Sequence, residues 1–155
     1  MEFALVIPIF LVILIGMVDV GRAIWANNAL ANAAREGARH AVVHGGSKSN
    51  TCPVGPAGPL TVIPVASSTC PYPSPSKESI RTVVRQFLVG GGDNVTITVC
   101  YGTGCSGDTD ATGATNERGT PVTVTVSSHV TTIIGTLLRL GTFDLDATST
   151  MLVNH

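Results

Sequence analysis

The hydrophobic pattern at the start of the chain predicts one long apolar segment. No charged residue stands between Phe3 and Val18, and apolar residues continue to Trp25, past Asp19 and Arg22. A helix rises about 1.5 Å per residue, so this segment is long enough to cross a hydrocarbon core of roughly 30 Å. A secretory signal peptide would be shorter and followed by a break in composition, whereas this pattern runs on as a helix. We therefore expect a membrane-spanning helix.

The helical pattern continues beyond the apolar segment with two distinct faces. Small residues recur every three or four positions on one face, at Ala26, Ala29, Ala33, Gly37 and Ala41. Such a stripe lets neighbouring helices approach closely, so we expect it to be an assembly face between subunits. The opposite face is polar, and we expect it to be wet or interfacial. It carries Asn28, Asn32, Arg35, Glu36, Arg39 and His40.

One helix is expected to form a domain of its own over residues 1–45. Gly45 and Gly46 follow the pattern, and glycine is common just after a helix C-terminus. A helix of about 42 residues would extend roughly 60 Å, too far for the small remainder of the chain to bury. Pro8 removes one backbone donor and clashes with the preceding turn, which predicts a kink or local unwinding near residues 4–8.

The rest of the chain, residues 46–155, is predicted to form a small exterior head. Residues 47–76 are rich in Pro, Gly, Ser and Thr, which predicts a surface loop. A second, amphipathic helix is expected next, before the glycines at 90–92. Its apolar positions follow helical spacing at Ile80, Val83, Val84, Phe87 and Leu88.

Three later segments alternate between apolar and polar residues, as β-strands do: 95–100, 122–126 and, more loosely, 143–153. We expect an antiparallel sheet with a Thr-rich outer face and an apolar inner face that packs on the helices. Residues 133–140 are expected to form a short helix or an apolar loop. The predicted fold class is therefore α+β, with the apolar half of the first helix projecting from the head.

Four cysteines lie beyond the apolar segment, in a region typical of an exported domain. We expect two disulfides. Sequence proximity favours Cys52–Cys70, which would close the proline-rich loop, and Cys100–Cys105, which would close a turn after a strand, over the other two connectivities. A zinc site would need paired, closely spaced ligands, and these spacings do not provide them.

The composition argues against several functions. Charged residues make up 12% of the chain, against about 25% in typical soluble domains, so part of it is expected in lipid or in a subunit interface. The net charge is -1 and the arginines are scattered, so we expect no nucleic-acid partner. No catalytic motif surrounds the four histidines, so we expect no enzyme activity, cofactor or metal.

Two short motifs each have a structural and a functional interpretation. Residues 108–113 resemble the first half of a calcium loop, but Gly119 stands where a bidentate glutamate is needed. An acidic turn is favoured there, and calcium bound between subunits with help from Glu117 is the alternative. Asn94 fits an N-glycosylation sequon. A strand start after a glycine-rich turn is favoured, and glycosylation is the alternative.

Several motifs of the chain match one known family. They are Glu2-Phe-Ala-Leu-Val-Ile-Pro-Ile-Phe, then Gly21-Arg-Ala, then residues 28–39 with their specific ending Ala33-Ala-Arg-Glu-Gly-Ala-Arg, and near the C-terminus Val122-Thr-Val-Thr-Val and Ala147-Thr-Ser-Thr-Met. With these motifs the chain resembles the TadE family of pilin-like proteins, found with tight-adherence type IV pilus systems.

The resemblance implies a precursor cut by a prepilin peptidase, a subunit held in the membrane by its first helix, and extraction into a filament by an ATP-driven assembly machine. Type IV pilins carry a glutamate at the fifth position of the mature chain, and Glu2 is the candidate for that role. A carboxylate at the tip of a membrane helix is costly in lipid, and the N-terminal ammonium of an adjacent subunit would neutralise it. The alternative is a carboxylate at the level of the lipid headgroups.

The position of Glu2 and the charges of the chain both bear on its N-terminus. Because Glu2 stands at the second position and not the fifth, we expect that residues are missing before Met1, that the mature chain starts unusually close to its glutamate, or that the precursor is processed differently. Arg22, Arg35 and Arg39 follow the apolar segment and no basic residue precedes it, which by the positive-inside rule places the head in the cytoplasm. The cysteines place it outside. A removed basic leader would resolve this conflict.

We therefore expect a structural subunit of an extracellular Tad-like pilus, a helical polymer of identical subunits joined through the first helix. The subunit would reside first in the cytoplasmic membrane and then in a cell-surface filament. The alternatives are a minor pilin that initiates or tips the filament, and a permanently membrane-anchored envelope protein whose head binds a partner or a sugar. A secreted enzyme is a distant third.

Overall fold

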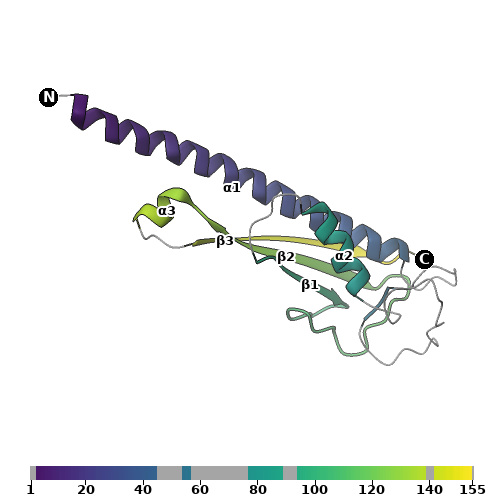
Figure 1. Cartoon of the computed structure of the whole chain (residues 1–155). Coiled ribbons are helices and arrows are strands. Elements are labelled where there is room, and N and C mark those ends of the chain that lie inside the picture. The colour runs from purple at the N-terminus through teal and green to yellow at the C-terminus, as the bar shows by residue number, and fades with distance from the viewer. Residues whose placement is uncertain (1–2, 45–53, 57–76, 89–93, 139–141, 155) are drawn as a thin grey trace.

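The computed structural model describes residues 3–44, 54–56, 77–88, 94–138 and 142–154. In chain order the elements are α1 (Phe3–His44), α2 (Glu78–Phe87), β1 (Thr96–Tyr101), β2 (Pro121–Thr131), α3 (Ile133–Leu138) and β3 (Thr142–Leu152). The predicted α+β class is confirmed. The N-terminal half of α1 projects from a head in which a sheet packs on helices (Figure 1).

α1 is one helix of 42 residues and ends at His44, directly before the predicted stop at Gly45. Pro8 lies inside it. The predicted unwinding near Pro8 is wrong, because helical structure continues through this turn (Figure 1). Pro8 stands in the second turn, so its missing N–H leaves unpaired only the carbonyl of Ala4, close to the helix start.

The sheet has three antiparallel strands in the order β1-β2-β3, as predicted. The alternation along β2 puts its valines, such as Val124, on the buried inner face and its threonines on the outer face. On the outer face, hydroxyl–hydroxyl hydrogen bonds of 3.0 Å join Thr123 to Thr150 and Thr125 to Thr148. The inner face is therefore the one that the helices cover.

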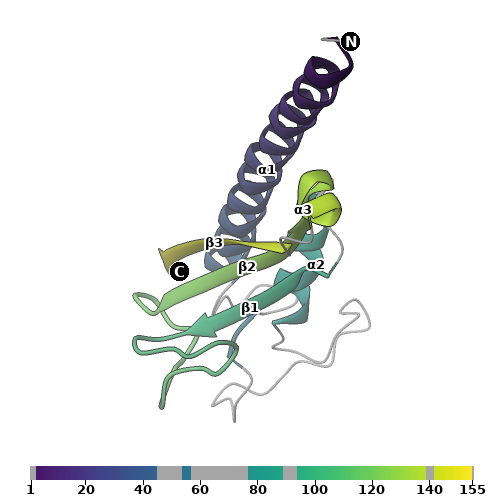
Figure 2. The ribbon, with the colours of Figure 1, turned by 90° about the vertical axis from the view of Figure 1, so that its left-hand side faces the viewer.

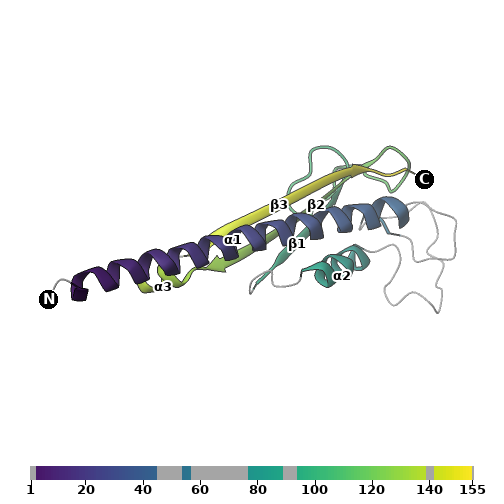
Figure 3. The ribbon, with the colours of Figure 1, turned by 90° about the horizontal axis from the view of Figure 1, so that it is seen from above.

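The core lies between the inner face of the sheet and the C-terminal half of α1. Leu30, Ala34 and Ala38 of α1 are fully buried, and so are Ile80 and Val84 of α2. Figure 2 and Figure 3 show α1 lying along the sheet, with α2 beside it. The prediction of a second, amphipathic helix is confirmed by α2, whose apolar face packs into this core.

The edge of β1 that faces away from β2 is closed by an acidic turn. The carboxylates of Asp108 and Asp110 accept hydrogen bonds from the backbone amides of Val99 (3.0 Å) and Tyr101 (2.8 Å). Lys77, which is 5% exposed, forms a salt bridge of 2.9 Å with Asp110. These oxygens already satisfy groups within the head, so residues 108–113 form the structural turn that the sequence favoured.

Candidate assembly surface

The N-terminal half of α1 presents an apolar surface that the rest of the chain leaves open. Its most apolar 18-residue window has a mean hydropathy of 2.2, and 6% of that window is buried. The six consecutive residues 9–14 are all exposed, and because a helical turn has about 3.6 residues they point in every direction. Pro8 is also exposed. By length and composition this helix can cross a membrane.

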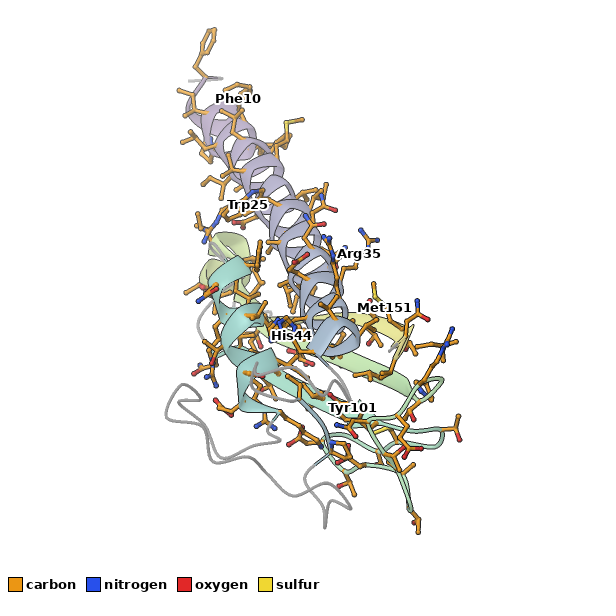
Figure 4. All side chains as sticks on the ribbon, turned by 90° about the vertical axis from the view of Figure 1, so that its right-hand side faces the viewer. Phe10, Trp25, Arg35, His44, Tyr101 and Met151 are labelled. Carbon is orange, nitrogen blue, oxygen red and sulfur yellow. A yellow bond between two sulfur atoms is a disulfide. The ribbon has the colours of Figure 1, made fainter. Side chains whose placement is uncertain are left out.

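Such a surface needs apolar surroundings. Phe10 is 58% exposed and Met17 is 68% exposed, and Figure 4 shows Phe10 projecting from the free end of α1, far from the head. Burying one large apolar side chain contributes about 1.5 to 3 kcal/mol, and a contiguous apolar patch of this kind marks a site of membrane or protein contact. A bilayer, or the α1 helices of other subunits, would supply these surroundings.

The small-residue stripe lies inside the head, not on its surface. Of its five members, Ala29 is half-buried and the other four are buried: Ala26, Ala33, Gly37 and Ala41. A Cβ atom at Gly37 would lie 2.4 Å from Cγ2 of Val84 in α2. The prediction that this stripe is an assembly face between subunits is therefore wrong. Its small side chains let α1 approach α2 and the sheet of its own chain.

On the polar face of the C-terminal half of α1, four of the six predicted residues are exposed (Asn28, Asn32, Arg35 and Arg39), whereas Glu36 and His40 are half-buried. Figure 4 shows Arg35 pointing outward from α1. Within the described part of the chain, neither Arg35 nor Arg39 has a salt-bridge partner. Ile24 and Trp25 are 59% and 55% exposed where the polar and apolar halves meet. This face is open to solvent or to another subunit.

Asp19 interrupts the exposed apolar half. It is 6% exposed, and Ile15 and Gly16 are half-buried, whereas Met17 and Val18 are exposed. A carboxylate is costly in lipid, so its burial by the protein itself fits a helix that crosses a membrane. Asp19 is absent from the site residues that the sequence predicts, although a single carboxylate within an apolar helix is a signal for it.

The predicted disulfides fall partly outside the described residues. Cys100 and Cys105 form the predicted bond, with Cα atoms 6.0 Å apart, and it closes the turn after β1. Cys52 and Cys70 lie outside the described residues, so their pairing stays a prediction.

Two further predicted sites remain untested. Asn94 is exposed and has a φ of 69°, a left-handed conformation that asparagine tolerates and that suits the turn before β1. Its glycosylation stays a prediction. Glu2 lies outside the described residues, and its pairing with an adjacent subunit also stays a prediction.

The fold and this surface define a class of protein, in which a membrane-type N-terminal helix carries an α+β head. A family model described as TadE-like protein matches residues 1–39. The match covers the apolar half of α1 and most of its C-terminal half, and it confirms the predicted resemblance. No significant match is found among curated proteins or among solved structures.

Proposed function

We propose that this chain is a structural subunit of an extracellular Tad-like pilus and that it polymerises through α1. The observation that carries the proposal is the N-terminal half of α1, where residues 6–14 stay exposed in every direction although the C-terminal half of the same helix packs in the head. A helix that served only to complete the core of its head would not keep such a surface. The surface suits the bilayer before assembly and the helices of other subunits afterwards.

Burial of apolar surface alone does not drive the step from bilayer to filament. Lipid tails are as apolar as the side chains of a neighbouring helix, so exchanging one for the other gains little. The hydrophobic effect, about 25 cal/mol per Å2, instead opposes exposure of α1 to water in either state. Shape and polar groups must therefore supply the specificity of assembly, and the assembly machine must supply the work.

Polar groups suited to this role lie near both ends of α1. Arg35 and Arg39 are exposed and have no salt-bridge partner within the described part of the chain, so they are open to acidic groups of a neighbouring subunit. At the other end, pairing of Glu2 with the N-terminal ammonium of an adjacent subunit would set the register of the stack.

The proposed route begins with cleavage of a precursor by a prepilin peptidase. The subunit then waits in the cytoplasmic membrane with its head outside, until the pilus machinery extracts it into the filament. The Cys100–Cys105 disulfide supports an exterior head, because disulfides persist in oxidising compartments. The role is structural and not catalytic, in keeping with a pilus-associated family.

Filaments sheared from cells that make the chain test the proposal. Electron microscopy should show helical filaments with α1 in their core, and mass spectrometry should find this chain as their main protein. A chain that stayed in the detergent-extracted membrane and was absent from filaments would contradict the proposal and favour the anchored envelope protein. A few copies per filament would favour the minor pilin.

A further inference from the structure

The connection between β2 and β3 carries apolar surface at one end of the sheet. α3 has the sequence Ile-Ile-Gly-Thr-Leu-Leu and contains no charged residue. Ile133 of α3 is 48% exposed, and Phe143, at the start of β3, is 59% exposed. We call α3 together with Phe143 the apolar tip. The core of the head does not account for these exposed side chains.

The apolar tip lies beside the membrane-type half of α1. Figure 1 and Figure 3 place α3 alongside the N-terminal half of that helix, and the two helices are in contact. Burial on α1 agrees with this placement, since Ile15 and Gly16 are half-buried and Asp19 is buried within an otherwise exposed stretch. The tip thus reaches the level of residues 15–19 of α1.

That level lies within the apolar span. If the stretch from Phe3 to Arg22 fills a hydrocarbon core of roughly 30 Å, residues 15–19 lie about 5 to 10 Å inside the boundary. Trp25, which is 55% exposed, stands one turn beyond Arg22, where membrane helices commonly carry tryptophan. Helices that lie in a membrane interface are buried by about 5 to 10 Å, which matches the position of the tip.

The hairpin of β2 and β3 changes from polar to apolar near the membrane boundary inferred from α1. His129 of β2 and Asp144 of β3 are cross-strand partners whose exposed side chains are joined by a hydrogen bond. The hairpin therefore turns from charged to apolar as it approaches the depth that α1 defines.

We propose that the apolar tip is a second membrane contact, which inserts into the outer leaflet beside α1 before the subunit is assembled. The tip meets lipid as soon as α1 spans the bilayer, without any partner protein. The contact holds the head at a fixed orientation on the membrane surface, and α3 covers the Asp19 side of α1 against acyl chains. This inference rests on the membrane-spanning role of α1 proposed above.

Single tryptophans in the full-length chain test the inference before any filament forms. Trp25 is the one tryptophan of the sequence, so a Trp25→Phe background leaves room for Ile133→Trp or Phe143→Trp. Each variant is reconstituted in phosphatidylethanolamine and phosphatidylglycerol vesicles, with or without lipids brominated in the upper part of the acyl chains. Both tip tryptophans should emit at shorter wavelength than an exposed one and be quenched by the brominated lipid, as expected for side chains buried at the membrane interface.

Two reference positions make the outcomes distinct. Thr112→Trp, in the exposed loop between β1 and β2, should be quenched by aqueous acrylamide and not by the brominated lipid. Leu11→Trp, in the middle of the apolar half of α1, should be quenched by lipids brominated deeper in the chain. Tip tryptophans that respond only to acrylamide while Leu11→Trp responds to lipid would overturn the inference and leave the anchoring by α1 intact.

The remaining outcomes also decide the question. If Leu11→Trp is not quenched by lipid, the membrane role of α1 fails and the inference fails with it. If the tip tryptophans respond to acrylamide in vesicles and become shielded only in filaments, the inference is overturned and the tip is a contact between subunits.

Discussion

The two halves of α1 differ in their relation to the rest of the chain. In the N-terminal half, large apolar side chains such as Phe10 and Met17 are exposed, and residues 6–14 are exposed around the whole helix. In the C-terminal half, alanines such as Ala33 and Ala41 are fully buried against α2 and the sheet, while an arginine-bearing face looks outward. One continuous helix thus belongs to two environments.

The difference shows that side-chain size determines what each half of the helix packs against. Small residues bring α1 close to its own head and fix the head on the helix, as the position of Gly37 against Val84 illustrates. Large residues would hold the helix in lipid or between other helices, where they make dispersion contacts with acyl chains or with the side chains of those helices. The halves should therefore respond in opposite ways to substitution.

The largest expected effect is that of Phe10→Asp in the apolar half. A carboxylate near the centre of a membrane helix costs about 2.5 to 3.5 kcal/mol on insertion scales, so the chain should be lost from the membrane fraction and from filaments. Thermal unfolding of the head in detergent should stay unchanged. Thr150→Asp, exposed on the outer face of the sheet, is the control and should leave membrane fractionation as it is. If the head of Phe10→Asp were unfolded, this would contradict the claim that the apolar half of α1 does not stabilise the head.

A glycine pair tests the C-terminal half. The added side chain in Gly37→Leu meets Val84, so the head should lose about 1 to 3 kcal/mol of unfolding free energy through overpacking. Gly21→Leu is the matched control, because nothing lies within 4 Å of a Cβ atom at that position. Circular dichroism of thermal unfolding in detergent micelles compares the two. Equal stability of both variants would show that the helix and head do not pack as described.

Arg35→Glu sharpens the comparison on the outer face of the C-terminal half. Arg35 is exposed, so its reversal should change the unfolding free energy of the head by less than about 1 kcal/mol. If this face pairs with acidic groups of a neighbour, fewer filaments should form and membrane insertion should stay normal. Arg118→Glu, in an exposed loop of the head, should leave the filament count unchanged. Equal filament counts for both variants would remove Arg35 from the interface.

The smallest expected effect is that of Ser128→Ala, at the last buried position on the inner face of β2. Its hydroxyl is buried and has no hydrogen-bond partner within the described part of the chain. Replacing it should leave the head equally stable or more stable by about 1 kcal/mol, since no bond is lost. Ser127→Ala, on the outer face, should change stability by less than about 0.5 kcal/mol. A clear loss of stability in Ser128→Ala would mean that the hydroxyl is satisfied.

Local patterns predicted most of the elements. The end of α1 before Gly45, the apolar face of α2 and the three alternating strands all follow from short-range spacing, because helix and strand periods are properties of neighbouring residues. The Cys100–Cys105 disulfide was predictable for the same reason, since its cysteines flank a short turn. Unwinding near Pro8 was predicted wrongly, because a proline in the second turn leaves only a carbonyl near the helix start without a partner.

Contacts between distant segments could not be predicted in this way. The stripe of small residues indicates that something approaches α1 closely, and the same pattern suits a neighbouring helix and a sheet equally well. Likewise, the spacing of Asp108 and Asp110 indicates a turn but not that their carboxylates bind the edge of β1.

The sequence by itself determined which segments are helical or extended and that α1 has an apolar half and a small-residue half. Those properties depend on the backbone and on side chains a few positions apart. Only the tertiary structure decided that the small-residue half packs in its own head, that most of the apolar half stays open, and that α3 contacts α1. These arrangements depend on how surfaces far apart in the chain fit together, which no local period encodes.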